Sequence, residues 1–227
     1  HDGDLDRAVD RIRSALAVAE RAGRTGGNTY PSLQSYLTTL HLQRRRRLEE
    51  LGQTGSMDYV SQGRELASLH LVWGEVRSAA AQIEPLAGRW SHLAQGGVPP
   101  PWFDTTRAQV LLRLGAAQEA QTLSVRSRQR ARDEGHQAAL RAASLTLAQA
   151  LLALGRLDDA EPLIAELEAD PALARQSRIT PATLRAQWLL ARGAAPRAVE
   201  TITAEVARLA GREQMPAYSA ALRLAAQ

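Results

Sequence analysis

The sequence contains no cysteine, and all 28 of its basic residues are arginine, because lysine does not occur. Without cysteine, the chain has neither a disulfide framework nor a thiolate metal site. Without lysine, it has no Walker-type phosphate loop and no amine for Schiff-base chemistry. Aromatic residues make up only 4% of the chain, whereas alanine and leucine are abundant, and this composition favours helices over sheets.

Signatures of membrane insertion and of catalysis are also missing. The most apolar region, residues 138–155, is interrupted by Arg141 and Gln149, so we expect no membrane span. The five histidines lack the spacing of a metal site, and no nucleophile elbow or glycine-rich phosphate loop occurs. We therefore expect a protein that is not an enzyme and uses no metal or cofactor. A cytoplasmic location is the simplest interpretation of the absent cysteine.

Two arginine clusters are the candidates for a nucleic-acid contact, residues 44–47 and the alternating arginines of 126–132. Successive residues on a helix point in different directions, so neither cluster forms one flat patch. A net charge of +4 over 227 residues is also too small to indicate nucleic-acid binding by itself. We interpret both clusters as solvated helix faces and expect no direct contact with nucleic acid.

The most informative feature is a repeated pattern, Ala-Gln-x-Leu-Leu-x-x-Gly, at residues 108–115, 148–155 and 186–193, with a weaker copy at 67–74. In all four copies one alanine lies seven residues before the glycine and another lies five residues after it. The glycines are 41, 40 and 38 residues apart: Gly74, Gly115, Gly155 and Gly193. A period near 40 with one helix pair per unit is typical of an α-solenoid.

Each part of the unit has a physical reason. Glycine can take the left-handed conformation that ends the first helix, and the two alanines let antiparallel helices approach closely. We therefore predict an all-helical protein, hinged at these four glycines. Pro85 should kink its helix or end it early. The predicted helices of the regular part span roughly residues 57–73, 75–94, 102–114, 116–134, 136–154, 157–169, 179–192, 195–211 and 214–226.

The N-terminal part departs from the period. Gly3 and Ala8 have the hinge spacing, so the chain should begin at the second helix of a unit, and we expect it to be a fragment of a longer array. That helix should run to about Ala22. A long helix is predicted from about Pro31 to Leu51, where either two helices have fused or a short helix replaces a normal one. We expect one array over residues 1–227, irregular at 30–56 and clearest at 57–213. Because four apolar residues lack evident cover, we also expect self-association through the ends: Ile12, Leu16, Leu222 and Leu224.

This unit resembles the tetratricopeptide repeat, whose consensus has a small residue in the first helix, a glycine at the turn and an alanine early in the second helix. Pro171 is similar to the terminating proline of that family. The resemblance covers about residues 57–213 and implies a right-handed superhelix of antiparallel helix pairs. Its period is longer than the usual ~34 residues, and in repeat style it is similar to the arrays of large LuxR-type transcriptional activators, including the maltose-activator kind.

The resemblance implies a binding and regulatory module that senses an effector or a partner protein in a bacterial signalling or transcriptional regulator. The alternative is a protein–protein interaction scaffold without a small ligand. In the resembling family, the first helices line the concave face and contact bound peptide through a polar residue at the position of Gln109, Gln149 and Gln187, with Ser68 in the weaker copy. Glutamine offers a donor and an acceptor, which suits an extended peptide or a small polar effector.

Further candidates for the concave site lie about one helical turn from these residues or beside them. They are Arg64 and Arg113, which can bind a carboxylate or a phosphate, together with Thr105, Thr183 and Trp102. The alternative is that glutamine and arginine here are merely tolerated on solvated helix faces. We interpret Trp73 and Trp90 as packing residues and leave the role of Trp102 open.

Overall fold

The computed structural model describes residues 2–21, 29–93, 99–173 and 180–210. Within these ranges the chain forms ten α-helices and no strand. None of these helices combines the length and the apolar character needed to cross a membrane. The helices are α1 (Asp2–Arg21), α2 (Thr29–Glu50), α3 (Met57–Trp73), α4 (Val76–Leu93), α5 (Pro101–Arg113), α6 (Ala117–Asp133), α7 (Gln137–Ala153), α8 (Leu157–Glu168), α10 (Pro181–Ala191) and α11 (Ala195–Ala210).

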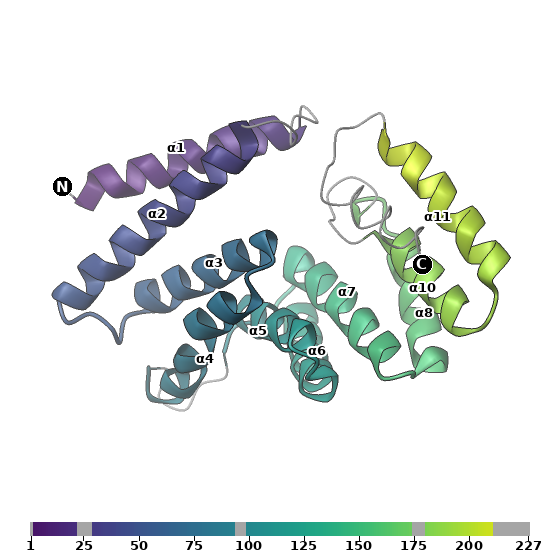
Figure 1. The fold of residues 1–227 in the computed structure, drawn as a ribbon. Helices are drawn as coiled ribbons and strands as arrows, with labels where there is room; N and C mark the ends of the chain where they lie inside the picture. The colour runs from purple at the N-terminus through teal and green to yellow at the C-terminus, as the bar shows by residue number, and fades with distance from the viewer. Residues whose placement is uncertain (1, 22–28, 94–98, 174–179, 211–227) are drawn as a thin grey trace.

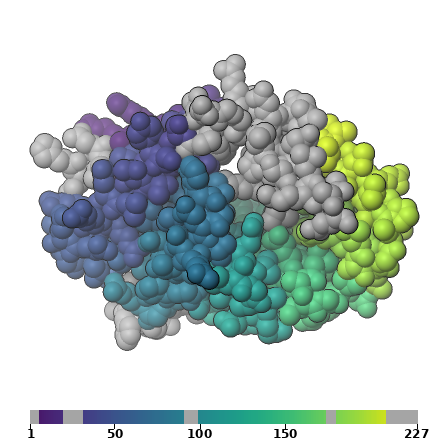
Figure 2. Space-filling view, viewed as in Figure 1, coloured from purple at the N-terminus to yellow at the C-terminus, as the bar shows by residue number. Residues whose placement is uncertain are grey.

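The helices pack mainly on their neighbours in the sequence, as expected of a helical array. They follow an arc in Figure 1, with α1 and α2 at one end and α10 and α11 at the other. The same order can be followed across the surface in Figure 2, from the purple and blue N-terminal helices to yellow α11. In addition, the first helices of successive pairs touch in series, α3 with α5, α5 with α7, and α7 with α10.

The four predicted hinge glycines end their helices in the left-handed conformation, with φ between 69° and 88°. At Gly155 the glycine N–H donates to the carbonyl of Leu152 at 3.0 Å, and the next N–H, of Arg156, donates to Leu151 at 2.9 Å. This pair of hydrogen bonds is the Schellman motif, which satisfies the last carbonyls of a helix. Gly52 and Gly135 end α2 and α6 in the same way, although the repeat did not predict them.

The alanines on either side of each hinge are buried between the paired helices. The two alanines of each unit belong to the same hydrophobic cluster. Because an alanine side chain is only one methyl group, it allows two helix backbones to come close. This burial agrees with the prediction that the alanines let the paired helices approach closely. None of the eight is more than 2% exposed: Ala67, Ala79, Ala108, Ala120, Ala148, Ala160, Ala186 and Ala198.

The irregular N-terminal part contains one continuous helix, α2, between α1 and α3. Leu16 of α1 is buried against α2 and α3, and Ile12 is half-buried beside it. The expectation that these two residues lack cover is therefore wrong. Leu222, Leu224 and the predicted helix at 214–226 lie outside the described residues. The helix α4 continues past Pro85 to Leu93, so it does not end early at the proline.

Candidate functional site

The three repeated glutamines occupy equivalent positions on α5, α7 and α10, but their surroundings differ. Gln109 and Gln149 are half-buried, whereas Gln187 is exposed. Gln109 Nε2 donates to Thr146 Oγ1 at 3.4 Å and so links α5 to α7. The amide of Gln109 is thus partly used within the fold, whereas the amide of Gln187 is the most accessible of the three.

Arg64 of α3 and Trp102 of α5 lie together where these two helices meet. The guanidinium carbon of Arg64 is 5.2 Å from the centre of the Trp102 ring, a cation–π contact. Arg64 also forms an ion pair with Glu65, which lies 3.4 Å from Arg13 of α1. Burial lowers the pKa of Arg64 even though Glu65 acts in the opposite direction. Its Nε is buried without a hydrogen-bond partner among the described residues.

Ser68 and Arg113, two further predicted residues, are accessible to different extents. Ser68 of α3 is half-buried. Arg113 is exposed at the end of α5 and forms no ion pair with any described residue. Arg113 is thus available to an acidic group on a partner.

Two of the predicted contact residues are not on the surface. Thr105 is 4% exposed; its hydroxyl donates to Pro101 O at 2.9 Å and lies 2.7 Å from Ser127 Oγ of α6. Thr183 is also 4% exposed, and its hydroxyl donates to Thr180 O at 2.7 Å in the first turn of α10. Because both hydroxyls are used inside the protein, these two threonines do not belong to a surface site.

The arginine clusters have a different role from the one predicted. The side chain of Arg45 is only 14% exposed, and it contacts Tyr59 OH at 3.0 Å and Gln82 of α4. Arg126 binds both carboxylate oxygens of Asp104 at 2.7 Å, which joins α6 to α5. Arg128 reaches Glu166 of α8 at 2.6 Å. The interpretation as solvated helix faces is therefore wrong for Arg45 and Arg128, whose side chains are 14% and 19% exposed, whereas Arg126 and Arg46 fit it with side chains that are 44% and 83% exposed.

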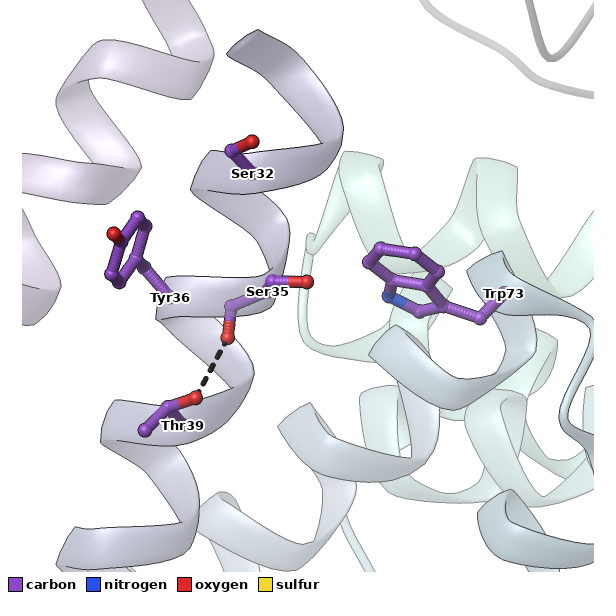
Figure 3. A pocket seen from close by; sticks show the side chains of 5 residues that line it. All are labelled: Ser32, Ser35, Tyr36, Thr39 and Trp73. Carbon is purple, nitrogen blue, oxygen red and sulfur yellow. Dashed lines mark hydrogen bonds between the residues drawn. The ribbon is translucent and has the colours of Figure 1, made fainter. Parts of the chain in front are cut away.

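A pocket of about 370 Å³ lies between α2 and the end of α3. Its lining comprises four residues of α2, namely Ser32, Ser35, Tyr36 and Thr39, and Trp73 of α3. Figure 3 shows the indole of Trp73 pointing towards α2 and a serine oxygen of Ser35 pointing towards the indole. The lining contains no charged residue.

The interpretation of Trp73 as a packing residue is wrong, because this side chain is 44% exposed. Trp73 directly precedes the hinge Gly74, and the residues in the same place before Gly115 and Gly193, Leu114 and Arg192, are exposed as well. The exposure of Trp73 could have been predicted from this position in the sequence, because the residue before a Schellman glycine lies at the end of its helix. Trp90, in contrast, is 5% exposed and packs on Phe103 with ring centres 5.9 Å apart.

Other kinds of site find no support in the described part of the chain. No group of three or more histidine, aspartate or glutamate side chains there is arranged to hold a metal ion. No protein-family model matches the sequence, and no curated protein matches it either. The resemblance to tetratricopeptide repeats therefore stays a prediction that depends on the repeat pattern.

Proposed function

We propose that this chain is a non-catalytic, right-handed tetratricopeptide-like superhelix that binds a peptide, a protein partner or a small polar effector. In this proposal it is the sensing array of a cytoplasmic bacterial signalling or transcriptional regulator. The observation that supports it best is the contact in series between the first helices α3, α5, α7 and α10. Such contacts make a continuous surface, and the repeat places one glutamine on each of its last three helices.

The chemistry of these helices suits a ligand with several polar groups in a row. Each glutamine can donate and accept, so Gln149 and Gln187 can bind amide groups that lie a few residues apart in an extended peptide. A neutral hydrogen bond contributes about 0.5–1.5 kcal/mol. Binding would therefore arise by addition along the array, with Arg113 and the Arg64–Trp102 pair as further contacts.

The arginines support a protein or effector partner over nucleic acid. Arg126 and Arg128, two arginines of the alternating cluster, are engaged by Asp104 and Glu166 within the fold. A phosphate backbone requires several cationic side chains that are free to bind it. Most of the charge in this cluster is already neutralised by carboxylates of the same chain.

A peptide selection tests the proposal. The chain is immobilised and screened against a random-peptide phage library, in parallel with the triple variant Gln109→Ala, Gln149→Ala and Gln187→Ala. We expect enriched sequences whose binding falls strongly in the variant, while the far-ultraviolet circular dichroism of the variant stays that of the parent.

The matched control changes Gln129 and Gln118, two exposed glutamines of the second helix α6, to alanine. This variant should keep the binding of the parent. Failure to enrich any peptide, or equal loss in the control, would contradict the proposed surface.

A further inference from the structure

The pocket between α2 and α3 has a composition that points to one class of ligand. Its α2 wall is a stripe of hydroxyl side chains, because Ser32, Ser35 and Thr39 recur at helical spacing on one face. Its α3 wall is the indole of Trp73, which the Gly74 hinge holds at the end of the helix. The pocket thus sets a flat apolar surface opposite a short polar edge.

The volume and exposure favour a small ligand. The pocket measures about 370 Å³, within the range of roughly 300–1,000 Å³ that is usual for small-molecule sites. Trp73 is 44% exposed, so a ligand that lies on it can cover apolar ring surface that now faces water. Removing such surface from water is favourable in proportion to its area.

The charge and the hydrogen-bonding groups of the lining further restrict the class of ligand. No lining residue carries a charge, so the pocket has no side chain that would neutralise an ionised ligand. The hydroxyl of Thr39 already donates to Ser35 O at 3.1 Å, which reduces the capacity of the polar edge. A ligand with many hydroxyl groups would find few partners in this lining and would leave the other hydroxyl groups in water, whereas one amide or hydroxyl group can be satisfied by Ser35.

We propose that this pocket binds an uncharged aromatic molecule with a single hydroxyl or amide group, whose ring lies on Trp73 and whose polar group faces Ser35. The site is separate from the glutamine surface described above and does not depend on it. It adds a small-molecule site at the place where the regular helix pairing begins.

The test uses benzamide as the probe and calorimetry or ligand-observed NMR as the measurement. Three comparison compounds each change one property: benzoate is charged, cyclohexanecarboxamide is not flat, and glucose is neutral but has many hydroxyl groups. We expect benzamide to bind more tightly than all three. Preferred binding of glucose or benzoate would overturn the proposal, as would the absence of benzamide binding.

Variants then locate the site. Trp73→Ala should weaken benzamide binding by about tenfold or more, and Ser35→Ala by about threefold. Leu42→Ala is the matched control, because Leu42 is exposed on the same helix but does not line the pocket. This control should bind as the parent does. All three positions are on the surface, so circular dichroism should show an unchanged fold, and benzamide binding that is unaffected by Trp73→Ala would refute the assignment.

Discussion

The pair of Asp104 and Arg126 should respond very unequally to removal of its two partners. The Asp104 side chain is 1% exposed, whereas that of Arg126 is 44% exposed, and two hydrogen bonds of 2.7 Å join them. If arginine is removed, a buried carboxylate loses its main partner. If aspartate is removed, arginine can turn into water and no buried charge remains.

The structure sets the size of each effect. Breaking a fully buried ion pair from one side costs about 3–5 kcal/mol. Because water can reach the place vacated by the half-exposed arginine, we expect about 2–3 kcal/mol for Arg126→Ala. For Asp104→Ala we expect about 1–2 kcal/mol, less than the roughly 1.5–3 kcal/mol of a charged hydrogen bond, because the freed guanidinium of Arg126 regains contact with water. The double variant should resemble Asp104→Ala, so that removing the aspartate partly restores the stability lost in Arg126→Ala.

Urea denaturation, followed by both circular dichroism and tryptophan fluorescence, measures these differences. Coincident curves from the two probes justify a two-state free energy, which an extended array does not guarantee. Arg46→Ala is the control, since its side chain is 83% exposed and lies 3.9 Å from Glu50; its effect should stay within about 0.5 kcal/mol. Equal losses for the two single variants, or a double variant that loses the sum of both, would refute the reasoning.

Three further predictions follow from single positions. Gly155→Val should cost about 1–3 kcal/mol, because φ is +69° although a Cβ would meet no atom within 4 Å; Gly155→Asn should cost clearly less, and equal costs would argue against a conformational cause. Gly63→Ala should also cost about 1–3 kcal/mol in urea, because its Cβ would clash with Leu86 Cδ1, and a neutral result would mean that the Leu86 side chain turns aside easily. Burial lowers the pKa of His41 below its usual 6.5. As the pH falls, the unfolded chain therefore takes up this proton first, and the free energy of unfolding should decrease from about pH 6.5 towards the lower pKa of the folded state. His41→Gln, measured over the same pH series, should remove this part of the pH dependence, and an unchanged pH profile would contradict the prediction.

The fold was predictable where the determining rule is local. A left-handed conformation at Gly115 or Gly193 depends on a few residues around the turn, and the sequence states it directly through glycine. The buried alanines could be predicted for the same reason, because their distance from the hinge fixes which side of the helix faces its partner. Gly135 could not be predicted from the repeat of about 40 residues, because it forms the same kind of hinge between two units and not within one.

The candidate site was less predictable, because exposure depends on which helix packs against each face. Thr105 shares its helix with Gln109, yet α6 covers Thr105 and brings Ser127 to its hydroxyl. In the sequence, Arg45 belongs to the arginine run 44–47, which we predicted to be solvated, but in the structure Tyr59 of α3 and Gln82 of α4 contact it. The pocket combines residues of α2 with a residue of α3, and no motif in either segment indicates the other.

Buried alanines and arginine ion pairs both stabilise contacts of the array. The buried alanines, together with the pair of Arg126 and Asp104, join the two helices within a unit. Other arginine pairs join successive units, as in Arg107 with Glu84 between α5 and α4 and Arg185 with Glu168 between α10 and α8. In both cases two nitrogens of one guanidinium bind one carboxylate, a geometry that lysine cannot reproduce. The carboxylates and guanidinium groups used in this way are not available to a ligand. If the chain binds a ligand as we propose, we expect recognition to depend more on neutral groups, such as the amides of Gln149 and Gln187 and the uncharged lining of the α2–α3 pocket.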